Sequence, residues 1–210
     1  MRSILAMIIL GLVGATLVSG GTASANSDPR LTPEERAEVV RLLNASQKEF
    51  LDMIENLTDA QWTYHAAINK WSVAQVSEHI LLSEGALFTA MENALAAKPN
   101  PEWETKTAGK TDFLERIMPT RAGRAQAPEA IRPTGKMTRK EVVARFKEAR
   151  AKTMKFVETT DLPMKAHTFD HPFPVFGTLN AYQWLIYIPY HNQRHNKQIA
   201  EVMANAGFPK

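Results

Sequence analysis

Four stretches of helical apolar periodicity constrain this chain most strongly. In each, apolar residues recur every three or four positions with charged residues between them, as in helices with one face in a core. Three of the stretches open on a capping box, in which Ser or Thr precedes Glu or Gln by three residues. The predicted helices run from Thr32 to about Leu57, from Ser72 to about Ala97, from Thr138 to about Thr160 and from about Thr178 to Gly207.

These helices predict an all-α fold, because no run of alternating apolar and polar residues is long enough to indicate a sheet. Four helices of this length favour a four-helix bundle. The connection between the second and third helices, about 98–137, is long, holds five prolines and includes a predicted short helix at 111–118. Connections of this length are uncommon in compact domains, which points to a role of their own.

The absence of cysteine excludes several chemistries. The chain offers no thiol nucleophile, thiolate-bound zinc, iron–sulfur cluster or disulfide, so any metal must be bound by nitrogen or oxygen. The balance of 25 Lys and Arg against 22 Asp and Glu leaves a net charge of +3. No recognition helix or aromatic interleaving accompanies it, and we expect no nucleic-acid partner.

Residues 116–140 are locally basic, with seven Lys or Arg side chains against the single acid Glu129. Such a segment suits either a phosphate or anionic lipid surface, or a solvated, proline-broken excursion of the chain. The second interpretation is favoured.

Residues 1–25 read as a cleaved secretory signal peptide. Arg2 provides the positive start, 4–18 is apolar apart from small residues and one threonine, and Ala23-Ser24-Ala25 has the small-x-small pattern of a cleavage site. An uncleaved membrane anchor is the alternative, although the apolar stretch is short for a spanning helix. We expect a periplasmic or secreted domain over 26–210, without a membrane span after cleavage.

Two of the histidine pairs are four residues apart, His167/His171 and His191/His195. Prolines and a glycine follow the first pair closely, so these are predicted to be loop histidines. The second pair lies inside the fourth predicted helix, where four residues turn by only about 40° and place both imidazoles on one face. Tyr187 and Gln198 share that face.

His79, in the second predicted helix, is the best candidate for a third ligand. The residues on its face are small or polar and would leave a cavity for an open coordination position and a substrate, namely Gln75, Ser83, Ala86 and Ala90. Spacing alone leaves two interpretations open: metal ligands, or histidines hydrogen-bonded to backbone. The motifs of di-iron bundles, zinc proteases, P-loops and nucleophile elbows are absent.

Two segments resemble the DinB-like family. Residues 70–80 resemble the tryptophan–serine entry and histidine of that family's second helix, and 190–199 resemble its His-x-x-x-His-x-x-Gln helix. The similarity covers about 33–206.

The resemblance implies an antiparallel four-helix bundle, often dimeric, with a divalent metal held by His79, His191 and His195. His167 and His171 match no ligand position of the family. Characterised relatives include transferases and isomerases that use low-molecular-weight thiols. This chain departs from them by its export signal, which makes a cytosolic thiol cofactor a poor expectation.

A divalent ion, with Zn, Ni and Fe not distinguished, would support metal-dependent hydrolysis or group transfer on a small molecule of unknown identity. Gln198 and Tyr187 are weak candidates for catalytic roles, and Glu78 projects about 100° away from His79 on the helix. The alternatives are a non-catalytic periplasmic bundle that binds a metal or ligand, and a bundle without metal.

Overall fold

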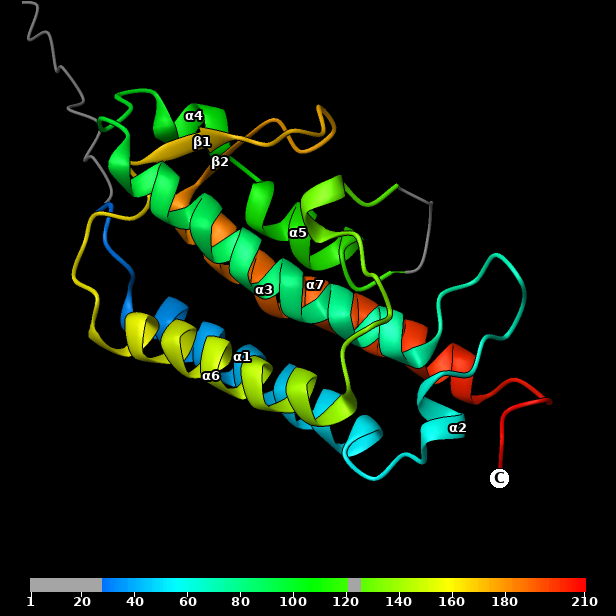
Figure 1. Ribbon diagram of the computed structural model, residues 1–210. Helices are drawn as coiled ribbons and strands as arrows, with labels where there is room; N and C mark the ends of the chain where they lie inside the picture. The colour runs from blue at the N-terminus through cyan, green and yellow to red at the C-terminus, as the bar shows by residue number, and fades with distance from the viewer. Residues whose placement is uncertain (1–27, 121–125) are drawn as a thin grey trace, which may run out of the picture.

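The computed structural model describes residues 28–120 and 126–210. Within them, four long helices form the predicted four-helix bundle (Figure 1). They are α1 (Pro33–Ile54), α3 (Val73–Ala96), α6 (Arg139–Thr159) and α7 (Ala181–Met203). The helices α1, α3 and α6 start at the predicted capping boxes, each of which is present with both of its hydrogen bonds. Side-chain acceptors for the first free N–H groups therefore define these starts.

The fourth helix differs from its prediction at both ends. It starts after Asn180, which forms a capping box with Gln183, and it ends at Met203. The residues before it form β2 (Thr178–Asn180), which pairs antiparallel with β1 (Thr168–Asp170). The prediction of an all-α bundle is confirmed, and this short hairpin was not predicted because strands of three residues are too short to show an alternating pattern.

Short helices occupy the connections. The predicted helix at 111–118 is α5 (Lys110–Ile117), preceded by α4 (Trp103–Thr107) and followed by the 3-10 turn η1 (Glu129–Ile131). The first predicted helix is also shorter than expected, since a second capping box starts α2 (Asp59–Trp62).

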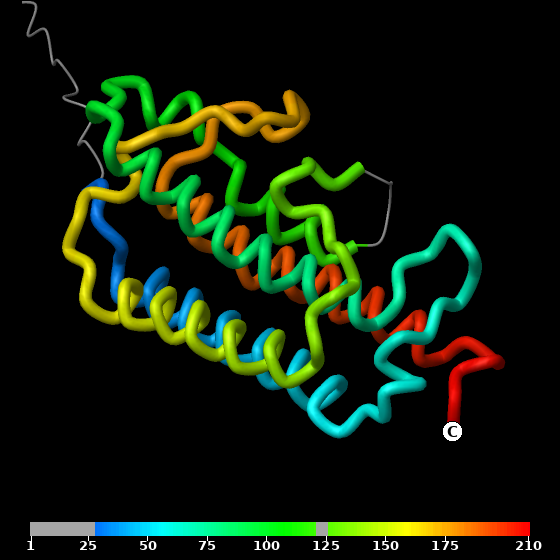
Figure 2. The backbone as a smooth tube through the Cα atoms, in the orientation of Figure 1, coloured from blue at the N-terminus to red at the C-terminus, as the bar shows by residue number. Residues whose placement is uncertain are grey.

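The direction of the helices explains the long connection. The chain colours show that α3 and α6 run in the same direction, whereas α1 and α6, and α3 and α7, are antiparallel pairs (Figures 1 and 2). A helix of 24 residues is about 36 Å long. The chain must travel back over that distance between α3 and α6, and it does so along the outer side of α3 and α7. The topology thus requires a long connection.

The interior contains two apolar clusters, one toward each end of the bundle. Between them lies a layer of buried polar side chains contributed by all four long helices. Its members are Ser46, Glu84, Arg150, Thr153, Asn192 and Asn196.

Several expectations concern parts of the chain that this structure does not test. The signal peptide over 1–25 lies outside the described residues, as do Arg121 and Arg124 of the basic segment. In the described part of that segment, Arg139 donates hydrogen bonds to the carbonyl oxygens of Glu55 and Leu57, which follow the end of α1. No helix among the described residues combines the length and apolarity that a membrane span needs.

Candidate metal centre

The histidines singled out in the sequence come together between α3 and α7. The ring centroids of His79 and His195 are 4.5 Å apart, those of His191 and His195 4.4 Å, and those of His79 and His191 5.1 Å. One ring nitrogen from each histidine lies within 4.8 Å of those of the other two. Two antiparallel helices packed along their length thus provide three imidazoles at one point.

Hydrogen bonds select the tautomers of two of these rings. Nδ1 of His79 lies 2.8 Å from the carbonyl oxygen of Ile131, and Nδ1 of His195 lies 2.8 Å from Oε1 of Gln198. Carbonyl oxygens only accept hydrogen bonds, so each Nδ1 carries the proton and donates. In the neutral form of each ring the lone pair is therefore on Nε2, which is the arrangement that outer hydrogen bonds impose on metal-binding histidines.

The third ring, His191, is held neutral by its surroundings. Burial lowers its pKa well below the usual value, and the neighbouring imidazoles lower it further. Burial likewise lowers the pKa of His79. A neutral imidazole is the form that binds a metal.

The three rings fit a divalent ion with nitrogen ligands. Nitrogen atoms bonded at 2.0–2.1 Å to one tetrahedral ion are about 3.3 Å apart, and the three ring nitrogens here all lie within 4.8 Å of one another. One turn after His79, the buried hydroxyl of Ser83 has no hydrogen-bond partner within the described part of the chain. A buried donor of this kind is usually satisfied by water or a bound ligand.

The connecting segment closes one side of this group of histidines. The carboxylate of Glu78, which is buried, accepts hydrogen bonds from the backbone N–H groups of Thr134 and Gly135 at 3.0 and 2.6 Å and from the Thr134 hydroxyl at 2.9 Å. These bonds hold the segment that presents the Ile131 carbonyl to His79. Glu78 therefore acts on the histidine through the loop.

The histidines do not lie where the sequence analysis expected them, beside a cavity lined by the small residues of the second helix. On the face of α3 that carries His79, Ser83 is buried but Ala86 is exposed, and Gln75 packs beside Gly135 of the connection. The histidines lie on the side of α3 and α7 that turns toward the connection and away from α1 and α6. The small residues of α3 therefore lie along the side of the helix that faces the connection, and they do not line a cavity between the four helices.

Tyr187 lies one turn before His191, with a ring-centroid distance of 6.1 Å. Burial raises the pKa of its phenol well above the usual value, so Tyr187 stays protonated. Its ring also lies near Trp184 and near His171 and Phe176 of the β1–β2 segment. The structure therefore places Tyr187 beside the histidines, and it places Gln198 as the hydrogen-bond partner of His195.

The other histidine pair does not join the site. Nδ1 of His167 is 2.8 Å from the carbonyl oxygen of Ala97, and His171 stacks on Trp184 with a centroid distance of 5.0 Å and an interplanar angle of 8°. Nδ1 of His171 accepts a hydrogen bond from the backbone N–H of Phe173. Both histidines fasten the segment around the β1–β2 hairpin.

His171 predicts a pH dependence of stability. Burial lowers its pKa to about 4 from 6.5, so between these values the unfolded chain binds more protons than the folded one. The stabilisation is complete above pH 6.5 and is lost as the pH falls toward 4. We expect His171→Asn, whose amide oxygen still accepts a hydrogen bond, to lose less unfolding temperature between pH 7 and pH 4.5 than the metal-free wild type. Equal losses in thermal unfolding would contradict this.

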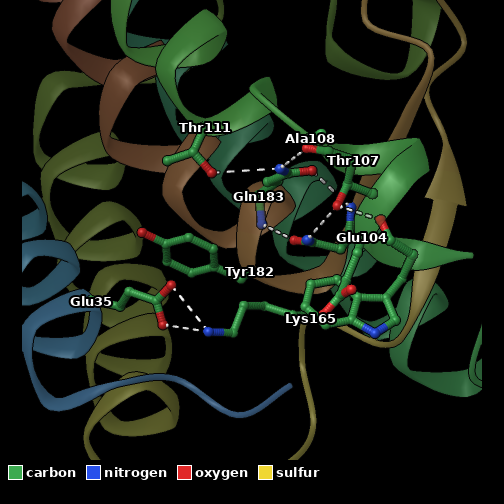
Figure 3. Close-up of a pocket in the computed structure, with 10 residues that line it drawn as sticks. Glu35, Glu104, Thr107, Ala108, Thr111, Lys165, Tyr182 and Gln183 are labelled. Carbon is green, nitrogen blue, oxygen red and sulfur yellow. Dashed lines mark hydrogen bonds and ion pairs between the residues drawn. The ribbon is translucent and has the colours of Figure 1, made fainter. Parts of the chain in front are cut away.

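A separate pocket of about 440 Å³ lies at the start of α7 (Figure 3). Nε2 of its Gln183 donates to the carbonyl oxygen of Thr107 at 2.9 Å, and Lys165 pairs with Glu35 at 3.0 Å. Gln183 precedes His191 by eight residues, about 12 Å along the helix. The pocket is thus distinct from the three histidines, and its polar side chains join α1, α4 and α7.

Comparison with known protein families matches residues 42–199 to the DinB superfamily. The chain belongs to the DinB superfamily. Among solved structures, YfiT from Bacillus subtilis is similar, with a TM-score of 0.59, 16% identity, and coverage of 85% of this chain and 91% of that chain. YfiT is described as a probable metal-dependent hydrolase with an unusual four-helix bundle topology. A search of curated protein sequences finds no match.

Sequence reasoning missed the groups around the histidines in this DinB superfamily member. The Ile131 carbonyl carries no side-chain signal, and only folding brings it to His79. Glu78 had a signal, since a carboxylate inside the apolar start of α3 requires hydrogen-bond donors. Asn192 and Asn196 repeat the spacing of the histidines one position later, which indicates a second polar face of α7.

Proposed function

We propose that this protein is a metal-dependent hydrolase acting on a small molecule, with a divalent ion held by His79, His191 and His195. One observation carries the proposal: three imidazoles from two helices converge, with one ring nitrogen of each within 4.8 Å of those of the other two. Histidines that only fill space in a core have no need to bring three ring nitrogens close together.

A divalent ion with three neutral imidazole ligands supplies Lewis-acid activation of a water molecule or of a substrate carbonyl. The protein's own groups prepare the site. Ile131 and Gln198 orient His79 and His195, and Glu78 holds the loop that carries Ile131. Tyr187, which stays protonated, is suited to donating a hydrogen bond and not to acting as a general base.

Hydrolysis is favoured over transfer to a thiol by two considerations. YfiT, which shares the fold over most of both chains, is described as a probable hydrolase. The apolar stretch 4–18 and the Ala23-Ser24-Ala25 pattern support export, and cytosolic thiols are scarce outside the membrane. We propose cleavage after Ala25, so that exported protein starts at Asn26.

The test is metal analysis of protein purified without chelators, followed by rate measurements on the metal-loaded protein with ester, amide and thiol-conjugation substrates. We expect bound divalent metal and hydrolysis that His195→Ala abolishes. His167→Ala, which removes a histidine bonded to a backbone carbonyl elsewhere, is the control and should retain activity. Metal binding with rates identical in wild type and His195→Ala would instead indicate a binding protein without turnover.

A further inference from the structure

The polar layer inside the bundle is built around one buried ion pair. Arg150 and Glu84 are almost completely buried, and two hydrogen bonds of 2.8 Å join the guanidinium to the two carboxylate oxygens. The remaining guanidinium N–H groups donate to the carbonyl oxygen of Leu43, the hydroxyl of Ser46 and Oδ1 of Asn192. All five donors of the guanidinium thus have acceptors, which come from α1, α3 and α7.

The layer continues along α7. Nδ2 of Asn192 donates to Oδ1 of Asn196 at 2.8 Å. Nδ2 of Asn196 lies 3.0 Å from the carbonyl oxygen of Ser46 and 2.8 Å from a carboxylate oxygen of Glu49. Two amides one turn apart therefore bind α7 to both α1 and α6.

These amides directly follow the two histidines of α7. Asn192 comes after His191 and Asn196 after His195, so the asparagine pair lies about 100° around the helix from the histidine pair. One face of α7 is bonded to α1 and α6 while the neighbouring face presents imidazoles toward His79. Any rotation of α7 moves both faces together.

The rotation of α7 matters because a metal centre tolerates little displacement. An imidazole nitrogen lies roughly 6 Å from the helix axis, so a rotation of about 20° moves it by about 2 Å. Metal–ligand distances are defined to about 0.2 Å. Apolar packing above and below the layer restricts such rotation less sharply than directional hydrogen bonds do, because apolar contacts have no preferred direction.

We propose that the layer of Glu84, Arg150, Asn192 and Asn196 is a positioning element for the metal centre, which sets the rotation of α7 so that His191 and His195 face His79. The inference rests on the proposed metal site. Buried ion pairs are weak contributors to stability, and apolar replacements of similar volume are often neutral or stabilising. If the layer positions α7, apolar replacements within it should therefore lower the metal affinity without lowering the stability of the fold.

The test is the triple variant Glu84→Leu, Arg150→Met, Asn192→Leu, which replaces the ion pair and one amide by apolar side chains. We expect an unfolding temperature equal to or above that of the wild type. We also expect a 10- to 100-fold lower affinity for Co²⁺, measured by titration of its visible absorption, as for substitutions around other metal sites. If the triple variant does not fold, Asn196→Leu alone provides the same measurement with the ion pair intact.

The control is Val157→Ala, which removes apolar volume from α6 within the neighbouring cluster and leaves the polar layer unchanged. It should lower the unfolding temperature and keep the wild-type affinity for Co²⁺. A folded layer variant with wild-type affinity would overturn the positioning role. Failure of the wild type itself to bind Co²⁺ would instead overturn the proposed function, so the two failures are distinguishable.

Discussion

His79→Ala is expected to lower the affinity of the protein for Zn²⁺ by 10²- to 10³-fold. Apparent binding free energies of closed four-ligand zinc sites are about 10–16 kcal/mol, which corresponds to about 2.5–4 kcal/mol for each ligand. His79 is the one histidine of the group on α3, so its removal leaves two ligands on a single helix. Competition titration with a chelator of known affinity measures the change.

His167→Ala is the matched control for this substitution. Like His79, His167 has Nδ1 at 2.8 Å from a backbone carbonyl oxygen, but it does not join the other histidines. The two variants lose the same kind of hydrogen bond, and only His79→Ala loses a ligand. Equal zinc affinities of His79→Ala and the wild type would show that the histidines do not act as a metal site.

Arg150→Met is expected to lower the free energy of unfolding by about 3–5 kcal/mol, because it leaves the carboxylate of Glu84 buried without its counter-charge. Within the polar layer, the carboxylate of Glu84 then keeps one hydrogen bond, which the Thr153 hydroxyl donates at 3.1 Å. Urea unfolding at neutral pH measures the loss.

Arg41→Met is the control, since Arg41 also forms an ion pair, with Glu38 at 2.6 Å, but on the exposed surface of α1. Exposed pairs contribute about 0–1 kcal/mol, so this variant should differ little from the wild type. A loss for Arg150→Met as small as that for Arg41→Met would mean that solvent or another donor reaches Glu84.

The parts of the fold that were predictable depend on local interactions. Thr32, Ser72 and Thr138 start helices because each side chain bonds to groups only three residues away. The pair His191 and His195 was predictable for the same reason, since helix geometry alone places them on one face. The start of α7 was predicted too early because β1 and β2 pair across a turn and convert Thr178 into a strand residue.

From the sequence it was possible to predict the starts of α1, α3 and α6, the bundle that the four long helices form, and the nitrogen or oxygen ligands of any metal. The packing of the helices was needed to show that His79 meets the α7 pair on the outer side of α3 and α7, beside Ile131. It was also needed to show that Asn192 and Asn196 bond to α6 and α1. The reason is physical: capping and periodicity act within one turn of the chain. The contacts of α7 instead depend on how the helices pack and on the direction in which the long connection returns. These contacts join α7 to α1, α3, α6 and the connection.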